Sequence, residues 1–360
     1  MPEHFLLSRV LLQFDSEKED LLEELSAVAL TPDGSLWVGS DEFLTIERLS
    51  PVAPYIYANH TKFKLKNYIN LFNEDDEIDI EGMDYSNGYL WVTGSHSTKR
   101  KKPKSKKSTE KNLDRLATIK SDYNRYLLAR VPIIDGEPFQ SYTEDDSSEG
   151  KVTAAYLQQT DNNNILIESL KKDEHLGIFV SNFIPSKENG LDIEGIAVEG
   201  NKVFLGLRGP VLRGWAVILE IEVEESEPGV LTLKEIGEDG QPYKKYFLDL
   251  DGLGIRELCL DGEDMIIMGG ATMDLDAAMS VFRLKDVFDL DEDTVVEQDS
   301  GDLEVLFHLP FTLQTDMAEG LTLFPCLGQP NSLLVVYDSP DKARFIDDTS
   351  LFVDVFKLKR

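Results

Sequence analysis

The tetrapeptide Asp-Ile-Glu-Gly occurs twice, at 79–82 and at 192–195, and each copy opens the same longer pattern. An apolar run comes first, then a short turn containing Gly and Asn, and then a second apolar run. The two segments read "IEGMDYSNGYLWVTGS" and "IEGIAVEGNKVFLGLR". Two such runs joined by a tight turn predict a β-hairpin. Weaker copies begin at Leu25, Ile255 and Met317, so the hairpin is a repeated unit of the fold.

Alignment of the five copies brings one residue of each to the same position: Ser26, Glu81, Glu194, Arg256 and Glu319, with separations of 55, 113, 62 and 63 residues. Further β-branched and aromatic runs follow most copies. Four strands in a unit of about 60 residues, repeated around a ring, predict an all-β fold with a single β-propeller domain over residues 1–360. Five blades are preferred. Six blades remain open, because the interval of 113 residues has room for one more.

The two ends of the chain carry strand-like runs, at 5–14 and 351–359. We expect them to complete one blade together and so to close the ring. Two segments interrupt the repeat. One is a short helical insertion at about 162–178, and the other is a basic insertion at about 98–112 with the core "KRKKPKSKK". The basic insertion has almost no apolar residues, which predicts a flexible loop.

The overall charge limits the partners of the chain. Lys plus Arg is 36 against 67 Asp plus Glu, a net charge of −31. Such a surface repels nucleic acids and anionic membranes, so nucleic-acid binding is not expected except through the Lys-rich loop. No apolar run is long enough to span a membrane, and the N-terminus does not resemble a signal peptide. Cys259 and Cys326 lie in apolar segments and are expected to be free thiols. A cytoplasmic location is predicted.

Propeller geometry groups the acidic residues. The inner strand of a blade starts at the face to which the second strand returns, so residues at both places share one rim around the channel. The residues expected on this rim are Asp79, Glu81, His96, Asp192, Glu194, Arg208, Arg213 and Glu319. Two carboxylates about 5 Å apart repel by about 3 kcal/mol at an effective dielectric of about 20. A bound cation, arginine neighbours or raised pKa values must therefore relieve the crowding.

An oxygen-rich ring suits Ca²⁺ or Mg²⁺, and the candidate ligands are Asp79, Glu81, Asp192, Glu194 and Glu319. The competing interpretation is structural: a glutamate before glycine can accept N–H bonds from the neighbouring blade and lock the ring. Both interpretations remain open at this stage.

The two Asp-Ile-Glu-Gly segments and "LQQTDNNNILIESLKKDEHLG" together resemble a bacterial family known only as a domain of unknown function. The resemblance covers most of the chain and implies no established activity. More distantly, the repeats at 79–82 and 192–195 and the pair Glu319–Gly320 are similar to those of esterase-like phytases. That resemblance implies a propeller with a Ca²⁺-rich acidic face that acts on phosphate esters. Gluconolactonase-type propellers offer a similar picture by analogy of fold alone.

Two functional hypotheses follow. In the first, the protein is a metal-dependent hydrolase of a phosphate ester or a lactone. Glu194 then helps to hold the metal and activate water, His96 moves the proton and Arg208 stabilises developing charge. In the second, the protein is a noncatalytic propeller that binds a small anionic molecule or a protein on the same face. Anion or partner binding would use Lys99, Arg100, Lys101, Lys102 and Arg213.

Overall fold

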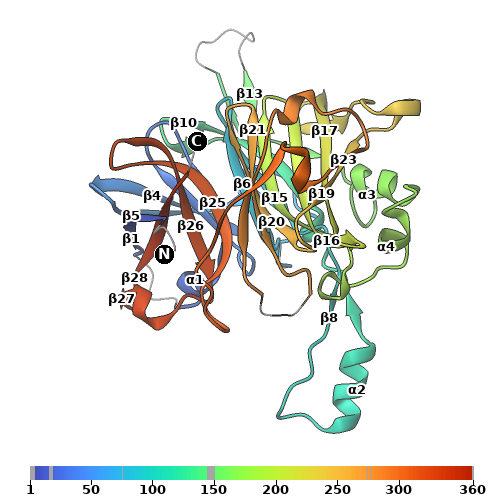
Figure 1. Ribbon diagram of the computed structural model, residues 1–360, viewed down its shortest axis with the longest axis horizontal. Coiled ribbons are helices and arrows are strands. Elements are labelled where there is room, and N and C mark those ends of the chain that lie inside the picture. Colours follow the sequence, from blue (N-terminus) through green and yellow to red (C-terminus); the bar gives the residue numbers. More distant parts are fainter. Residues whose placement is uncertain are drawn as a thin grey trace.

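A computed structural model describes residues 5–15, 19–74, 76–143, 151–273, 275 and 277–358 (Figure 1). The chain is all-β, with antiparallel strands arranged in a propeller-like fold. Each hairpin of the sequence repeat is present. The first strands of these hairpins are β2 (Leu25–Leu30), β6 (Ile80–Ser86), β15 (Asp192–Glu199), β20 (Gly254–Asp261) and β25 (Met317–Cys326). The second strands are β3 (Leu36–Ser40), β7 (Tyr89–Gly94), β16 (Lys202–Leu212), β21 (Asp264–Gly270) and β26 (Gln329–Asp338).

Outer strands extend each hairpin by antiparallel pairing. They are β4 (Thr45–Ala53) and β5 (Ile56–Lys64) after the first hairpin, and β10 (Leu128–Ile134) and β14 (Ala155–Leu157) after the second. The long strand β17 (Trp215–Glu227) pairs with both β18 (Val230–Leu233) and β19 (Lys244–Asp249). The fourth hairpin continues into β22 (Ser280–Leu284) and β24 (Leu303–His308).

The two ends of the chain meet in one sheet. Strand β1 (Leu6–Gln13) pairs antiparallel with β28 (Ser350–Lys357), which in turn pairs with β26. The expected pairing of the terminal runs is therefore present, although the last residue of the 351–359 run, Lys359, lies outside the described residues. The remaining short strands of the described chain border these sheets: β11 (Glu137–Pro138), β12 (Ser141–Tyr142), β13 (Val152–Thr153), β23 (Thr294–Val296) and β27 (Phe345–Asp347).

The first strands of the hairpins contact one another in a closed order. β2 contacts β6, β6 contacts β15, β15 contacts β20, β20 contacts β25 and β25 contacts β2. Glycine makes this approach possible at the repeat. A Cβ on Gly82 would lie 3.0 Å from the carbonyl oxygen of Glu194, and one on Gly195 would lie 2.9 Å from the amide nitrogen of Leu258. The glycine of Asp-Ile-Glu-Gly thus serves close packing between neighbouring strands.

Apolar side chains fill the spaces between neighbouring sheets. Trp37 of β3 packs in one cluster with Ile80 of β6 and Val92 of β7, and Phe204 of β16 packs with Leu258 of β20. Similar clusters join the other neighbouring sheets. Successive side chains of each strand therefore pack in two different interfaces, one on each side of its sheet. Cys259 and Cys326 are free, as expected.

The helices lie outside the sheets. α1 (Glu19–Glu23) precedes β2, and α3 (Ile165–Leu170) and α4 (Gly177–Ser181) lie in and just after the expected helical insertion. Leu166 and Leu170 of α3 are buried against the sheets. None of the helices in the described part of the chain is long and apolar enough to cross a membrane.

Candidate functional site at the channel mouth

The five residues aligned by the sequence repeat share an unusual backbone position. In every hairpin, the pairing register skips one residue of the first strand, and the skipped residues are Ser26, Glu81, Glu194, Arg256 and Glu319. A β-bulge of this kind re-aims a side chain and interrupts the ladder. The second strand β16 skips one residue as well, which is Arg208. The bulges bring these side chains to one face, where those of Glu81, Glu194, Arg208 and Glu319 line the floor of a cavity.

Arginines neutralise part of this floor. The Nε atom of Arg256 lies 2.9 Å from Oε2 of Glu194, and its Nη2 donates a hydrogen bond to Oε1 of Glu319. Arg208 donates from Nη1 to Oε1 of Glu194 over 2.6 Å and lies 3.5 Å from Asp192. These two arginines form four ion pairs with three carboxylates, Asp192, Glu194 and Glu319, and all three were singled out in the sequence. Glu194 is thereby held between two guanidinium groups.

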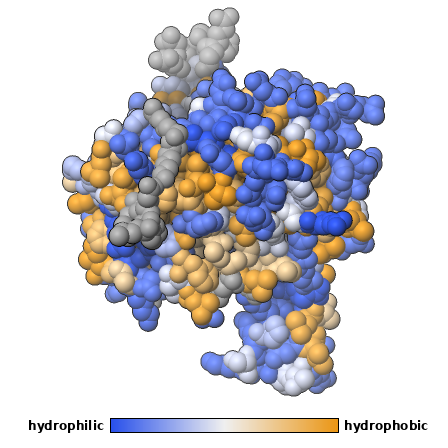
Figure 2. Space-filling view, viewed as in Figure 1, coloured by the Kyte–Doolittle hydropathy of each residue, from blue (hydrophilic) through white to orange (hydrophobic). Residues whose placement is uncertain are grey.

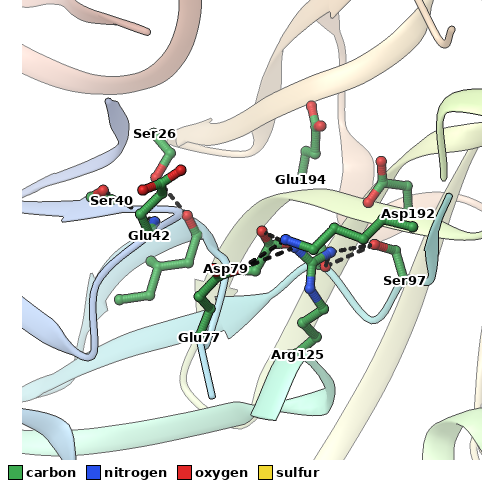
Figure 3. A network of polar contacts seen from close by, with 12 residues as sticks. Ser26, Ser40, Glu42, Glu77, Asp79, Ser97, Arg125, Asp192 and Glu194 are labelled. Atoms are coloured by element: carbon green, nitrogen blue, oxygen red, sulfur yellow. Dashed lines mark hydrogen bonds and ion pairs between the residues drawn. The ribbon is translucent and has the colours of Figure 1, made fainter. Parts of the chain in front are cut away.

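A third arginine binds the first Asp-Ile-Glu-Gly segment. Arg125 belongs to the 3₁₀ turn Tyr123–Tyr126 and donates to Oδ1 of Asp79 and, over 3.1 Å, to the hydroxyl of Ser97 (Figure 3). Asp79 is 5% exposed and Arg125 is 4% exposed, so this pair is buried. Figure 3 also shows Asp192 and Glu194 on the far side of the same hollow.

Glu81 differs from the other floor glutamates. It is partly exposed to the cavity, and it makes no hydrogen bond or ion pair with a described residue. Burial and the charges of Glu194, Asp79 and Glu319 raise its pKa well above the usual value. A raised pKa favours the protonated form of this carboxyl, which can donate a hydrogen bond to a ligand.

Neighbouring carboxyls are perturbed in the same direction. Burial, together with the charges of Asp79 and Asp338, raises the pKa of Asp41 to about 7. Burial and Glu194 raise the pKa of Asp192 to about 7, against the opposing effect of Arg208. Burial raises the pKa of Glu319 to about 8, although Arg256 opposes the shift. Arginine ion pairs and raised carboxyl pKa values therefore reduce the repulsion among the carboxyl groups of the floor.

The cavity above this floor, which we call the channel-mouth cavity, has a volume of about 900 Å³. One side is the acidic floor. The other side is basic and consists of Lys187 and of residues 99–120, which we call the arm. The arm residues that line the cavity include Lys99, Arg100, Lys101, Lys102, Lys104, Arg115 and Lys120. The expected meeting of the basic insertion with the acidic rim is therefore present.

The arm is more structured than the flexible loop that its composition predicts. Strands β8 (Lys99–Arg100) and β9 (Ile119–Lys120) pair at its base, and α2 (Thr109–Ala117) forms its outer part, which projects downward in Figure 1. Residues beyond the basic core supply the order. Ser108 caps the helix, and Arg115 donates to the carbonyl oxygen of Lys102 over 2.5 Å. Leu113 and Leu116 remain 62% and 44% exposed, and Figure 2 shows apolar atoms on one side of the arm.

Two of the expected anion-binding residues are already paired. Lys99 donates to Glu77 over 2.8 Å, and Arg100 forms a bidentate pair with Glu188. By contrast, the ammonium groups of Lys101, Lys104, Lys120 and Lys187 make no hydrogen bond or ion pair with a described residue. Four cations thus face the cavity without a carboxylate partner.

The placement of His96 corrects the sequence prediction. His96 is 1% exposed and lies behind the floor, in the wall of a separate cavity. Its Nδ1 lies 2.8 Å from the carbonyl oxygen of Gly94, and its Nε2 lies 2.8 Å from Nδ2 of Asn164. Burial lowers the pKa of His96 to about 4. A neutral imidazole with both nitrogens engaged holds Asn164 in place and is not positioned to move a proton at the channel mouth.

Arg213 also differs from expectation, because it lies at the exposed tip of the β16–β17 turn and outside the channel-mouth cavity. The backbone N–H bonds between neighbouring blades that were considered for the floor glutamates are accepted instead by two other acidic residues. Asp84 accepts from the amide of Val198 over 2.7 Å, and Glu257 accepts from the amide of Ile196 over 3.0 Å. Both bonds join neighbouring first strands. Ser26 donates to the carbonyl oxygen of Ile80 and so joins β2 to β6.

The floor does not fit a resident divalent metal in the arrangement described. Glu194 and Glu319 are bound by arginines, and Asp79 is bound by Arg125. Among the described residues, no three carboxyl, imidazole or thiol side chains converge closely enough to hold a metal ion. A Ca²⁺ or Mg²⁺ ion bound to Asp79, Glu194 or Glu319 would have to displace a guanidinium group from that carboxylate.

Several cavity residues were missed from the sequence. Asp41 follows the end of β3 and Asp338 is the last residue of β26, each in the same position as Arg208 relative to its strand pair, so the repeat carried a usable signal for both. Arg256 was aligned with the glutamates but not assigned to the site. Arg125 gave no signal, because it reaches the floor from a 3₁₀ turn outside the repeat.

Comparison with solved structures finds propeller-like proteins of low similarity. Aldose sugar dehydrogenase from Streptomyces coelicolor, in its PQQ-bound form, has a TM-score of 0.41 and 11% identity over 97% of this chain and 98% of that one. A putative glucose dehydrogenase from Thermus thermophilus has a TM-score of 0.40 and 11% identity, over 97% and 100%. Virginiamycin B lyase from Staphylococcus aureus has a TM-score of 0.34 and 10% identity, over 92% and 67%. At these TM-scores the likeness carries no argument about function.

No curated protein matches the chain in sequence. A family model does match, over residues 24–354, which include every hairpin of the repeat, the arm and the floor of the cavity. The chain therefore belongs to a family described as "Protein of unknown function (DUF3616)".

Proposed function

We propose that this protein binds a small anionic molecule at the channel mouth, between the arm and the floor. The observation that carries this proposal is a set of four ammonium groups around one cavity of about 900 Å³, on Lys101, Lys104, Lys120 and Lys187, which form no hydrogen bond or ion pair with a described residue. Cavities of this size accept small molecules and place a few charged groups to orient them. Lysine ammonium groups bind phosphate and carboxylate oxygens as point charges.

The acidic floor is compatible with an anion above it. Arg125, Arg208 and Arg256 neutralise Asp79, Glu194 and Glu319 by direct contact. Glu81 and Asp41 have raised pKa values, which favour their protonated forms. Protonated carboxyls donate hydrogen bonds, so they can bind the oxygen atoms of an anion that lysines attract.

We also infer that the ring has five blades. The closed order of contacts among β2, β6, β15, β20 and β25 supports this number, as does the sharing of one sheet by β1 and β28. The channel-mouth site would then lie on the axis of the ring, where every blade contributes one bulged residue.

Isothermal titration calorimetry with methyl phosphate tests the proposal. The double variant Lys101→Ala/Lys104→Ala should weaken binding about tenfold or more, because each charge-assisted hydrogen bond contributes about 1.5–3 kcal/mol. Lys172→Ala is the matched control, since Lys172 is exposed and lies outside the cavity. Equal affinity in the double variant and the control would contradict the proposal.

A second candidate function is enzymatic, and Glu81 is the observation that favours it. A carboxyl with a raised pKa and no partner among the described residues can act as a general acid toward a bound ester or lactone, and Arg208, which lines the same cavity, can stabilise negative charge. This form of the hydrolase hypothesis uses no metal. Phosphatase and lactonase assays of Glu81→Gln test it, and activity equal to that of the unaltered protein would exclude the role. A Ca²⁺-induced rise in Tm that Glu81→Gln removes would instead favour the metal-dependent form.

The exposed apolar side of α2 favours the alternative in which the arm docks a protein partner. Replacement of residues 101–118 with a short Gly-Ser linker should then abolish partner capture while β8 and β9 and the propeller-like fold remain intact. Loss of methyl phosphate binding in the same variant would point to the small-molecule function.

A further inference from the structure

A second cavity, of about 310 Å³, opens beside the channel mouth. Polar and charged residues line much of it, but one wall is apolar and comes from two loops, one after β21 (residues 271–273, 275 and 277–279) and one before β25 (residues 309–316). The apolar side chains are Met273, Leu275, Met279, Leu309 and Phe311, and we call this cavity the apolar trough.

The exposure of these side chains is notable in so charged a protein. Leu275 is 64% exposed, Phe311 is 53% exposed and Met273 is 44% exposed. Single exposed apolar residues need no explanation, but several that line one hollow beside a polar site commonly mark a binding surface. Folding leaves these side chains in water, so a bound apolar group would gain the hydrophobic contribution that the fold leaves unused.

The trough and the channel-mouth cavity are continuous. They share Lys187, Arg208, Glu319 and Asp338 as lining residues. Lys187 stands at the junction, and its ammonium group is unpaired among the described residues. Arg208 also ties the two parts together, because its Nε donates to the carbonyl oxygen of Thr272 over 3.2 Å. A charged group at Lys187 therefore has apolar surface on one side and the lysines of the arm on the other.

We propose that the ligand is an amphipathic anion, with a phosphate or carboxylate head near Lys187 and a single apolar chain in the trough. This inference rests on the proposed function, since it extends the anion site by a tail-binding site. The volume of the trough suits one chain of a free molecule. A bilayer is disfavoured as the source of that chain, because the net charge of −31 repels anionic membrane surfaces.

Alkyl phosphates below their micellar concentration test the inference with the full-length protein. Calorimetry compares methyl, butyl and octyl phosphate, which share one head and differ in the tail. Complete burial of a methylene strengthens binding about fourfold, so a partly open trough should give at least about a tenfold gain from butyl to octyl phosphate. Leu275→Ser and Phe311→Ser should remove most of this gain and leave the affinity for methyl phosphate unchanged.

Leu313→Ser is the matched control. Leu313 is 65% exposed, close to the 64% of Leu275, and belongs to the neighbouring loop but does not line the trough. It should bind all three phosphates like the unaltered protein. Because the altered side chains are exposed, all three variants are expected to fold, and circular dichroism with Tm measurements checks this.

The outcomes separate the two proposals. If methyl phosphate binds and octyl phosphate binds no more tightly, the tail site is refuted and the anion site stands. The tail site is also refuted if the gain with chain length persists in Leu275→Ser and Phe311→Ser. If neither phosphate binds, both proposals fail. Sedimentation with phosphatidylglycerol vesicles covers the membrane alternative, and binding to vesicles without binding to free octyl phosphate would overturn the inference.

Discussion

Replacement of Arg256 with methionine tests whether arginine ion pairs stabilise the buried carboxyl groups at the floor of the channel-mouth cavity. Arg256 is 6% exposed and touches two floor glutamates, Glu194 and Glu319. Methionine keeps much of the side-chain length and removes the charge. Glu194 would retain Arg208 as a partner at 2.6 Å, whereas Glu319 would lose its only arginine among the described residues. The effect should therefore come mainly from Glu319.

The size of the effect should depend on pH. Below pH 8, Glu319 is mostly protonated, because its pKa is about 8. The variant then loses hydrogen bonds of a buried site, which reduces the free energy of unfolding by about 1–3 kcal/mol. Above pH 8 the unaltered protein ionises Glu319, whereas loss of Arg256 raises the pKa of Glu319 further and keeps the carboxyl protonated. At pH 9, one unit above the pKa of about 8, this difference adds up to about 1.4 kcal/mol to the loss. We expect a total near 2–4 kcal/mol at pH 9.

The sign follows from proton linkage. A carboxyl whose folded pKa is raised contributes stability that is fully present below its unfolded pKa of about 4.3 and is lost as the pH rises through its folded pKa. A further rise in the folded pKa extends this loss to higher pH. The variant and the unaltered protein should therefore differ least at pH 6 and most at pH 9.

Urea unfolding followed by tryptophan fluorescence at pH 6 and pH 9 measures both values. The double variant Arg256→Met/Glu319→Gln should recover most of the loss at pH 9, because glutamine cannot ionise. Arg9→Met is a control from an exposed pair, since Arg9 is 50% exposed in its contact with Asp354. It should cost about 1 kcal/mol or less at both pH values. A loss for Arg256→Met that is the same at pH 6 and pH 9 would refute the reasoning.

Three further predictions address other parts of the site. The unaltered protein should lose stability as the pH rises from about 4 through about 7, because the pKa of Asp41 is raised to about 7. In urea titrations, Asp41→Asn should remove up to about 4 kcal/mol of this pH dependence. An unchanged dependence of stability on pH in this variant would contradict the raised pKa. His96→Gln should lower the free energy of unfolding by about 1–3 kcal/mol, because buried hydrogen bonds are lost. The affinity for methyl phosphate, measured by calorimetry, should stay unchanged. A large loss of affinity would show that His96 does contribute to the binding site. Gly254→Ala should lower the Tm, because its Cβ would lie 2.0 Å from the carbonyl oxygen of Arg208, and a normal Tm would show that this backbone contact yields easily.

The repeat made much of this fold predictable. Alignment of Ser26, Glu81, Glu194, Arg256 and Glu319 predicted that these residues occupy one position of successive hairpins, and the bulges confirm it. The pairing of the two terminal strands was also predictable, because the apolar runs at both ends of the chain needed partner strands. Strand pairing depends on patterns that span many residues, so single irregularities do not hide them.

The detailed chemistry of the site was less predictable, because it depends on single contacts between distant residues. Nothing near Asp79 in the sequence indicates that Arg125 pairs with it. Composition predicted a flexible arm, but α2 depends on a cap at Ser108 and on one arginine-to-carbonyl bond. His96 follows a strand and is flanked by serines, which suggested an exposed loop. Its burial comes from Asn164, which lies next to a helix that the sequence placed only approximately.

The five bulges separate the packing of a strand against neighbouring sheets from the placement of its functional side chains. In a regular strand, changing a side chain on one face affects packing with the neighbouring sheet, because every second residue belongs to the core. A bulged residue stands outside that alternation, and its side chain points into the channel. Ser, Glu and Arg all occupy this position in one chain without a change in the surrounding register. The chemistry of the channel mouth can therefore be rewritten at five positions while the interfaces that hold the sheets together stay the same.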